Sequence, residues 1–258
     1  MWRVSSAVAS HPGLRREENE DAFCVRGDLG LYLVADGMGG HAAGEVASRL
    51  AVDAVEAFIE DTRHADVERT WPFPYDPKLS LDGNRLKAAL RLANRRIAAA
   101  VVRDQALKGM ATTAAAVLVD AGAGRITVAH VGDSRIYRRR AGQLAQVTHD
   151  HSWVGEQVRA GSLTEADAKR HPWRNVVTRA LAGGDDPEVD VAQLDGRQGD
   201  LLMICSDGLS GVVGDDTCQA IITAAASLDQ ACADLIAAAN AGGGPDNITV
   251  ALIKIDVD

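Results

Sequence analysis

The chain has 258 residues, and its 27 Lys and Arg residues against 36 Asp and Glu residues give a formal net charge of −9. With 47% hydrophobic and 24% charged residues, the composition is that of a globular rather than a disordered protein. The acidic balance and the aromatic content of only 4% disfavour nucleic acid as a partner, because binding it usually needs a basic groove or a stacking surface.

Neither a membrane span nor a disulfide framework is indicated. No apolar run approaches the roughly 18 residues that cross a bilayer, and the N-terminal stretch lacks the apolar core of a signal peptide. We therefore expect a cytoplasmic protein without membrane attachment. The cysteines form no CxxC pair, which favours buried, reduced thiols over disulfides or a zinc site: Cys24, Cys205, Cys218 and Cys232.

In chain order, the spacing of apolar residues predicts groups of strands and helices rather than a strict strand–helix repeat. Helical periodicity occurs over 41–61, 85–106, 150–160, 165–170, 215–226 and 231–240. Short β-branched or apolar runs bounded by turns predict strands at 31–35, 114–119, 125–131, 135–139, 201–205 and 248–255. Residues 62–84 contain WPFPYDP, which has three prolines, and are predicted to form an inserted loop.

The links between neighbouring strands indicate the type of sheet. DAGAG joins the strands at 114–119 and 125–131, and RAGQ joins the strand at 135–139 to an apolar run at 144–147. Such short links connect antiparallel strands, whereas parallel strands need a long crossover. We therefore expect a largely antiparallel sheet in a layered α+β fold.

Acidic residues accompany several of the predicted strands. LYLVADG places Asp36 at a strand end, ITVAHVGD places Asp133, LLMICSDG places Asp207, and GGGPDN places Asp246 just before the last strand. A single Asp-Gly pair is usually only a turn. Four aspartates at strand ends can converge, however, and hard oxygen ligands without neighbouring histidines favour Mg²⁺ or Mn²⁺ over zinc or copper.

A family resemblance rests on motifs in this order: RREENEDAF, VADGMGGHAAGE, GMATTAAAVL, VGDSRIY, HPWRNVVTRALAG, CSDGLS and GPDNITV. They resemble the motifs of the metal-dependent protein serine/threonine phosphatases of type 2C, in their bacterial form, over nearly the whole chain. The resemblance implies one catalytic domain over 1–258, folded as a layered α-β-β-α sandwich of two mainly antiparallel sheets flanked by helices. It also implies hydrolysis of phosphoserine and phosphothreonine in proteins by a metal-activated water.

The resemblance assigns the aspartates at the strand ends to a metal centre. Asp36 would bridge two Mn²⁺ or Mg²⁺ ions, and the carbonyl group of Gly37 would be a further ligand. Asp207 and Asp246 would complete the ligands of one ion. Asp133 would help to bind a possible third ion.

The remaining site residues implied by the resemblance come from the first forty or so positions. Glu20 would reach the second ion, often through water, and Asp21 would support the centre from behind its ligands. Arg16 would hold two phosphate oxygens with its planar guanidinium group. His41 could donate a proton, bind water or only cap the nearby helix, so the general acid is left unassigned. The candidate catalytic residues are Arg16, Asp36, His41 and Asp207.

Residues 150–174 resemble the mobile flap that lies beside the metal centre of the bacterial members. His149, His151 and His171 suggest a metal cluster at first sight. Capping and amphipathic signals around them instead favour a loop or helix surface, because hard cations prefer carboxylates to histidine.

Two other functions stay open at this point. A regulatory pseudophosphatase would bind phosphoproteins without turnover, although the intact set of Asp36, Asp207 and Asp246 argues against it. A hydrolase of small phosphate esters would use the same centre on another substrate. The expected partners are phosphorylated proteins, namely the targets of a bacterial serine/threonine kinase and the kinase itself, with no nucleic acid and no membrane.

Overall fold

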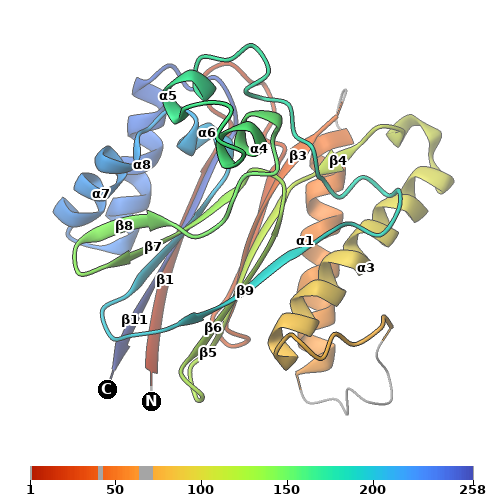
Figure 1. Cartoon of the computed structure of the whole chain (residues 1–258), viewed down its shortest axis with the longest axis horizontal. Coiled ribbons are helices and arrows are strands. Elements are labelled where there is room, and N and C mark those ends of the chain that lie inside the picture. Colours follow the sequence, from red (N-terminus) through yellow and green to blue (C-terminus); the bar gives the residue numbers. More distant parts are fainter. Residues whose placement is uncertain (1, 40–42, 64–71, 258) are drawn as a thin grey trace.

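The computed structural model describes residues 2–39, 43–63 and 72–257, which form two antiparallel sheets packed face to face (Figure 1). The first sheet has the strand order β1 (Trp2–His11), β11 (Ile248–Val257), β10 (Leu201–Cys205), β7 (Arg135–Arg140) and β8 (Gln143–Gln146). The second has the order β2 (Asp21–Arg26), β3 (Leu31–Met38), β5 (Ala114–Asp120), β6 (Arg125–Val131) and β9 (Asp190–Asp195), and β4 (Ala111–Thr112) pairs with β3. The predicted antiparallel pairing is therefore confirmed.

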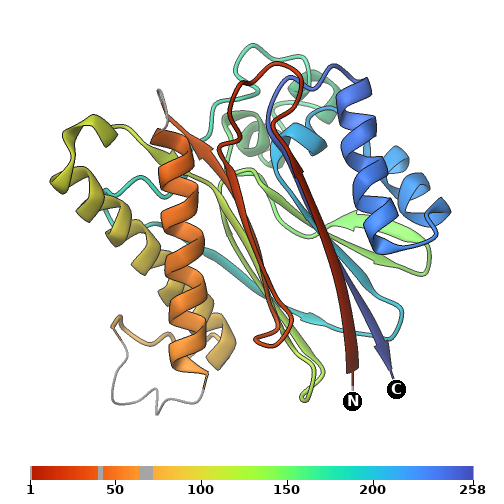
Figure 2. The ribbon, with the colours of Figure 1, turned by 180° about the vertical axis from the view of Figure 1, so that it is seen from behind.

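Helices cover the two outer faces of the sheets (Figures 1 and 2). The long helices α1 (Ala43–Thr62) and α3 (Leu81–Arg103) pack on the second sheet, and α7 (Asp215–Ala224) and α8 (Leu228–Ala241) pack on the first. Three buried apolar clusters fill the spaces between the four layers, one between the sheets and one beneath each helical layer. The fold is thus the expected α-β-β-α sandwich. None of the described helices is long and apolar enough to cross a membrane.

Hydroxyl side chains fix where four of the helices begin. Ser80, Ser152, Thr164 and Ser227 each accept a hydrogen bond from a backbone N–H three residues later, which satisfies a donor that the first helical turn leaves free. The cap at Ser80 corrects the predicted inserted loop at 62–84. Residues 81–84 belong to α3 and Thr62 ends α1, so the connection is shorter than predicted, and its residues 64–71 lie outside the described residues.

Strands β1, β2 and β9 are not among the sequence predictions. The sequence of β1, WRVSSAVASH, has small and polar residues along an edge of the first sheet, and β9 is a polar edge of the second. One half-exposed edge strand buries too little apolar surface to give a strong pattern. The register of these strands is set by long-range pairing, such as Trp2 with Val257 and Asp190 with His130.

One end of the sandwich gathers the loops and short helices. It carries α4 (Trp153–Arg159), α5 (Glu165–Ala168) and α6 (Asp207–Ser210), whereas both chain termini lie at the opposite end (Figure 1). Strands β3 and β10 lead toward this upper end, so the residues that follow them in the chain meet there. The predicted acidic strand ends are consequently brought to one face of the molecule.

Candidate metal centre

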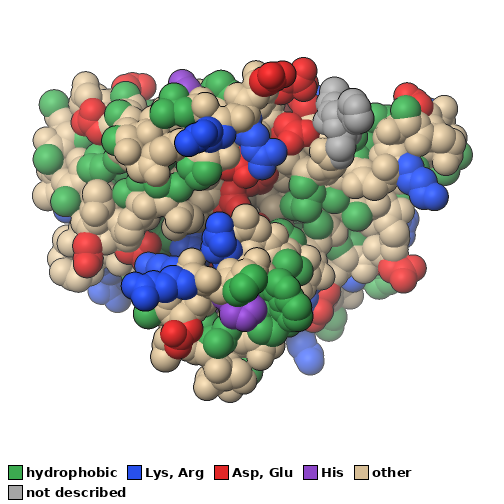
Figure 3. Space-filling view, turned by 90° about the horizontal axis from the view of Figure 1, so that it is seen from above, with side chains coloured by type: hydrophobic (Ala, Val, Ile, Leu, Met, Phe, Trp, Pro, Cys, Tyr) green, Lys and Arg blue, Asp and Glu red, His purple; other side chains and the backbone are tan. Residues whose placement is uncertain are grey.

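The acidic residues at the strand ends meet in a depression on the face that carries the short helices (Figure 3). Asp21 begins β2 and lies directly opposite Asp36 of β3 in the antiparallel register. Asp207 follows β10 as the first residue of α6, and Asp246 precedes β11. Strands from both sheets therefore supply the carboxylates.

Carboxylate repulsion and removal from water act on the same groups. Burial is the largest cause that raises the pKa of Asp36 well above its usual range, and the charges of the other aspartates then contribute in the order Asp21, Asp207, Asp133 and Asp246. Burial is also the largest cause for Asp21 and Asp133, whose pKa values rise to about 7, and for Asp207, whose pKa is raised. The centre is thus a set of like charges. Among the described side chains near it, only Arg16 and Arg135 bring a compensating positive charge.

Asp21 lies in the second sheet, but its side chain is bound by a residue that follows a strand of the first sheet. The Ser206 hydroxyl donates to Asp21 Oδ2 over 2.8 Å and accepts from the backbone N–H of Thr249 at 3.0 Å. The other carboxylate oxygen, Asp21 Oδ1, is buried and has no hydrogen-bond partner among the described residues. A buried oxygen of this kind has free lone pairs, as expected for a group that faces a cation or an ordered water.

Asp36 is oriented through its backbone by two threonines. Its N–H donates to Thr113 Oγ1 at 3.1 Å, and its carbonyl oxygen accepts from the Thr113 N–H at 2.9 Å and from Thr112 Oγ1 at 2.9 Å. Thr113 Oγ1 also shares a 2.7 Å hydrogen bond with Ser134 Oγ. Thr113 therefore connects the backbone of Asp36 to the turn that carries Asp133.

Glu20 and Gly37 sit together where β2, β3 and α1 converge. The Gly37 N–H donates to the Glu20 carbonyl oxygen at 3.1 Å, and Ser48 Oγ of α1 donates to the same oxygen at 2.6 Å. The Asn247 side chain accepts from the Glu20 N–H at 2.8 Å. A Cβ atom on Gly37 would lie 2.2 Å from the carbonyl oxygen of Gly44, so the close approach of backbone here requires glycine.

Arg16 reaches the rim of the acidic cluster. Its Nη2 donates to Asp246 Oδ2 at 2.8 Å, and the two side chains are 49% and 36% exposed. The hydrogen bond to Asp246 raises the pKa of Arg16, and the charges of Glu20 and Asp36 act in the same direction. The exposed, cationic head group is therefore next to the carboxylates and still open to a ligand from solvent.

The histidines named in the sequence analysis have different outcomes in the structure. His41 lies outside the described residues. His149 is exposed, as expected for a surface loop, whereas His151 is completely buried, so the predicted surface position is wrong for that residue. Its burial follows from hydrogen bonds to Gly132 and Asp190 that the local sequence does not reveal.

Thr113, Ser206 and Asn247 are functional supports that carry no sequence signal of their own. Ser206 and Asn247 each stand next to a candidate ligand, in the strings CSDG and GPDN, whereas Thr113 lies in MATT, away from any candidate ligand. Their hydroxyl and amide groups form hydrogen bonds with Asp36, Asp21 and Glu20, each more than seventy positions away in the chain. The positions next to a candidate ligand are therefore one place to look for such supports.

The residues fit a pair of hard divalent cations. The cluster offers carboxylate and backbone carbonyl oxygens, and no described histidine or cysteine belongs to it, which matches the ligand preference of Mg²⁺ and Mn²⁺. The unpartnered Asp21 Oδ1 and the raised carboxylate pKa values are both relieved by a cation.

The raised pKa values predict that the metal-free protein loses stability as the pH rises. A carboxyl group whose pKa is about 7 when folded and about 4 when unfolded binds a proton on folding, so its contribution falls by about 1.4 kcal/mol per pH unit within that window. The buried His130 and His151 have lowered pKa values and act in the opposite direction, mainly below about pH 6.5. We therefore expect the Tm of the metal-free protein to fall between about pH 6.5 and 7.5 and to level off above the folded-state pKa of about 7.

Calorimetry with a chelator present, and again with Mn²⁺, checks this expectation. Bound cations need deprotonated ligands, so the stabilisation by Mn²⁺ should increase over the same pH interval. A metal-free Tm that is constant or rises from about pH 6.5 to 7.5 would contradict the proposed clustering of Asp21, Asp36 and Asp133.

Comparison with known proteins identifies the family to which the chain belongs. The model of the family described as protein phosphatase 2C matches residues 14–241. The serine/threonine protein phosphatase PstP of Mycobacterium tuberculosis is 38% identical over 249 residues, covering 96% of this chain and 44% of PstP. The serine/threonine phosphatase stp of Listeria monocytogenes is 34% identical, covering 93% of this chain and 90% of its own length. The chain thus spans less than half of the length of PstP.

Solved structures give the same result. The crystal structure of M. tuberculosis PstP/Ppp superposes with a TM-score of 0.85 at 37% identity, covering 98% of this chain and 99% of that one. The PstP catalytic domain in complex with two manganese ions has a TM-score of 0.81 at 35% identity, with full coverage of both chains. The match over 14–241 and these similarities show that the chain belongs to the protein phosphatase 2C family.

Proposed function

We propose that the protein hydrolyses phosphoserine and phosphothreonine in proteins with the help of two Mn²⁺ or Mg²⁺ ions. The observation that carries this proposal is the convergence of Asp21, Asp36, Asp207 and Asp246 from two sheets at one open face. Membership of the family and the names of its relatives, which are serine/threonine phosphatases, support the substrate class. The complex of the PstP catalytic domain with two manganese ions supports the cofactor.

The family resemblance supplies the proposed roles of the ligands, and the acidic cluster that brings these residues together supports them. Asp36 would bridge the two ions, with the Gly37 carbonyl on one of them. Asp207 and Asp246 would hold one ion, and Glu20 would reach the other, while Asp21 supports Asp36 across the β2–β3 pair. Bound ions of this kind lower the pKa of a shared water and reverse the negative charge of the site.

The chain's own residues would orient the substrate and stay fixed during turnover. The Arg16 guanidinium group, open to solvent at the rim, is suited to hold two oxygens of a phosphate in one plane. The Thr112 hydroxyl donates to the Asp36 carbonyl oxygen, Thr113 Oγ1 accepts from the Asp36 N–H, and the Ser206 hydroxyl donates to the Asp21 carboxylate. These hydrogen bonds keep the two aspartates in place. The proton for the leaving oxygen has no assigned donor among the described residues, and His41 stays a prediction.

The biological setting is also a proposal. The targets of a bacterial serine/threonine kinase, and the kinase itself, would be the substrates, since they carry the phosphorylated residues that such an enzyme removes. A cytoplasmic location is supported by the four cysteines, all of which are buried and unpaired. Residues 1–258 would form one catalytic domain in which 150–174 act as a flap.

A comparison of substrates tests the proposed function. Phosphate release from a phosphothreonine peptide in excess Mn²⁺, abolished by a chelator, is the expected result. A pseudophosphatase would bind the peptide in calorimetry without releasing phosphate. A hydrolase of small esters would cleave p-nitrophenyl phosphate with a much higher kcat/KM than any phosphopeptide, and either outcome would replace the proposal.

Arg16→Ala is predicted to weaken phosphate binding without emptying the metal centre. A charge-assisted hydrogen bond contributes about 1.5–3 kcal/mol, so KM for a phosphopeptide should rise by about tenfold or more, as should the inhibition constant of inorganic phosphate. The Mn²⁺ affinity should not fall, because Asp246 loses a competing cation. Arg15→Ala, at the neighbouring exposed position, is the control. If both variants have the KM of the unmodified protein, Arg16 belongs to the solvated surface instead.

A further inference from the structure

His151 lies at the base of the 150–174 segment and binds both backbone groups of Gly132. The His151 backbone N–H donates to the Gly132 carbonyl oxygen at 3.0 Å, and the Gly132 N–H donates to His151 Nδ1 at 3.1 Å. The side chain of His151 is completely buried. One residue therefore holds the peptide unit on either side of the glycine that precedes Asp133.

Gly132 is also confined from the opposite side. Its φ of +107° favours glycine, and a Cβ atom would lie 2.6 Å from Thr113 Cβ. The hydroxyl group of Thr113 forms a hydrogen bond with that of Ser134, which follows Asp133. The turn that carries Asp133 is thus clamped between Thr113, which also binds the backbone of Asp36, and His151.

Asp190 of β9 holds the far nitrogen of the His151 ring. His151 Nε2 is 3.2 Å from Asp190 Oδ2, and Arg179 Nη1 is 3.5 Å from Asp190 Oδ1. Burial lowers the pKa of His151, which favours the neutral ring. Because Nδ1 accepts from Gly132, the ring proton is on Nε2 and is donated to Asp190.

This arrangement argues against a metal site at the same place. Ligand atoms of His130, His151 and Asp190 lie within 4.8 Å of one another, a spacing that suggests a metal cluster. A ring that binds a metal through Nε2 carries its proton on Nδ1, which here would point at the Gly132 N–H. The Arg179 guanidinium group, 3.5 Å from His151 Nε2, adds a positive charge where the cation would be.

Backbone hydrogen bonds at and near His151 also join the start of the 150–174 segment to the residues that follow its end. Its carbonyl oxygen accepts from the Thr178 N–H at 2.8 Å, and the next residue but one, Trp153, donates its N–H to the Val176 carbonyl oxygen at 2.8 Å. The start and the end of the segment are therefore joined next to the ring that holds Gly132. A displacement at this joint would be transmitted to the turn that carries Asp133.

We propose that His151, oriented by Asp190, is a positioning residue that sets the place of the Asp133 carboxylate and links it to the base of the flap. The proposal rests on the proposed function, in which Asp133 helps to hold a third, weaker cation. It assigns to His151 and Asp190 a role that neither the acidic motifs nor the resemblance gives them.

Three variants separate positioning from simple loss of packing. His151→Asn keeps an acceptor near the position of Nδ1, His151→Leu removes it, and His130→Leu is the matched control. His130 is a buried histidine stacked on His151 with ring centroids 4.5 Å apart, but its Nε2 pairs with the His149 carbonyl oxygen rather than with Gly132.

The expected pattern is a separation of kcat from KM. Loss of a partner that orients a metal ligand typically costs 10–100-fold, so His151→Leu should lower kcat by about tenfold or more, with KM for a phosphopeptide within about twofold. His151→Asn should recover most of kcat. His130→Leu should lower Tm by a similar amount and keep kcat. Equal losses of kcat in both leucine variants would reject the proposal.

Coupling to Asp133 supplies the second test. In the Asp133→Ala background, His151→Leu should have little further effect on kcat, because the group that it positions is gone. The same additional loss in both backgrounds would overturn the proposal. Should His151→Leu fail to fold, the comparison of His151→Asn with Asp190→Ala in the two backgrounds decides the same question.

Two measurements do not depend on activity. In the metal-free protein, ¹⁵N spectra of the ring should show the proton of His151 on Nε2, and hydrogen exchange at Gly132 should speed up in Asp190→Ala and His151→Leu but not in His130→Leu. Calorimetric Mn²⁺ titration should show the weakest site lost in His151→Leu and the two tighter sites kept. A proton on Nδ1, or unchanged Gly132 exchange, would refute the proposal even if the unmodified protein proved inactive on phosphopeptides.

Discussion

Asp207→Asn is expected to lower the kcat/KM of phosphopeptide hydrolysis by at least about a hundredfold at limiting Mn²⁺. The amide keeps the size of the side chain but removes the negative charge of the ligand proposed at the start of α6. Loss of an outer partner of a metal ligand already costs up to about a hundredfold, so loss of the ligand itself should cost no less. Comparable changes at Asp36 and Asp246 should be at least as damaging.

The same substitution should make the metal-free protein more stable, not less. Burial and the charge of Asp246 raise the pKa of Asp207, which shows that the ionised side chain is unfavourable in the folded chain. A neutral amide removes one of the repelling charges, so the metal-free Tm near pH 8 should rise by a few degrees. The Mn²⁺-dependent increase in Tm should shrink, because the folded state binds the ion more weakly.

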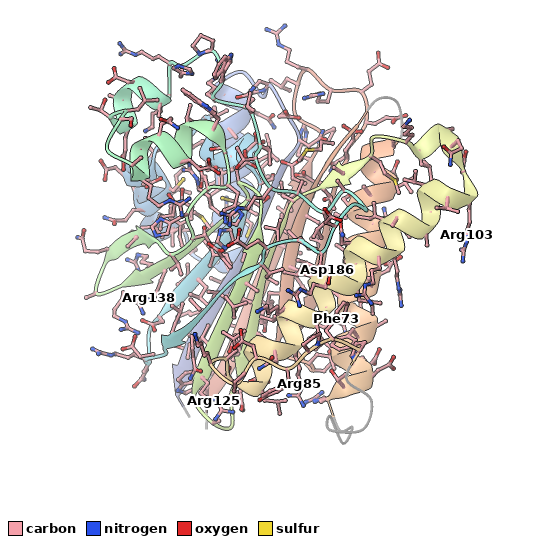
Figure 4. All side chains as sticks on the ribbon, turned by 45° about the vertical axis from the view of Figure 1, so that its right-hand side comes forward. Phe73, Arg85, Arg103, Arg125, Arg138 and Asp186 are labelled. Carbon is pink, nitrogen blue, oxygen red and sulfur yellow. The ribbon has the colours of Figure 1, made fainter. Side chains whose placement is uncertain are left out.

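Asp186→Asn is the matched control for this prediction. Asp186 is exposed beside α3, where it faces Arg95 at 3.6 Å, and it belongs to a different surface from the acidic centre (Figure 4). It should change neither kcat/KM nor the Mn²⁺-dependent Tm, since an exposed ion pair contributes little. Near-normal activity of Asp207→Asn at limiting Mn²⁺ would remove Asp207 from the proposed centre.

The acidic centre was largely predictable because its signals are local. Asp36 and Asp207 each follow an apolar strand within a single short string, and the strand periodicity shows where each carboxylate must emerge. Their convergence follows from two antiparallel sheets whose ends meet at one face. Strand identity together with the family motifs was therefore enough to collect these residues.

The supports of the centre could not be predicted in this way. Ser206 binds Asp21 across 185 positions, and His151 binds Asp190 across 39 positions. A lone hydroxyl or histidine gives no periodic signal, and its partner is fixed only once the sheets have packed. The edge strand β9, which supplies Asp190, gives too weak an apolar pattern to be predicted, and without it the local capping signals favour a surface position for His151.

Repulsion between the carboxylates of the centre destabilises the folded chain, whereas hydrogen bonds around them hold the site in place. Four aspartates with raised pKa values oppose folding. Thr113 accepts from the Asp36 N–H, Asn247 accepts from the Glu20 N–H, and Ser206 donates to Asp21 Oδ2, and these hydrogen bonds hold the site against that repulsion. A cation then binds a site that does not have to be assembled. Rigidity at the base of the site should therefore matter as much as the carboxylates themselves.

Gly37→Ala tests that rigidity and should be strongly destabilising for a change of a single methyl group. The added Cβ would lie 2.2 Å from the Gly44 carbonyl oxygen and 2.5 Å from the Glu20 carbonyl oxygen, and both are backbone atoms that cannot rotate away. Overpacking of this kind costs about 1–3 kcal/mol, so for a chain of this length Tm should fall by roughly 2–6 °C. Moving α1 away from β3 would also displace Glu20 and the Gly37 carbonyl group, and we expect Mn²⁺ affinity and kcat to fall together.

Gly184→Ala separates this effect from the general cost of replacing glycine. A Cβ at Gly184 would meet nothing within 4 Å, and its φ is not among the positive values, so the alanine should be neutral or slightly stabilising, by up to about 1 kcal/mol. Thermal melting without metal measures the packing cost, and Mn²⁺ titration of the folded protein measures the damage to the site. If Gly37→Ala melts within a degree or so of Gly184→Ala and binds Mn²⁺ normally, then β3 and α1 can separate freely. In that case the carbonyl group of Gly37 is not held where a metal ligand must be.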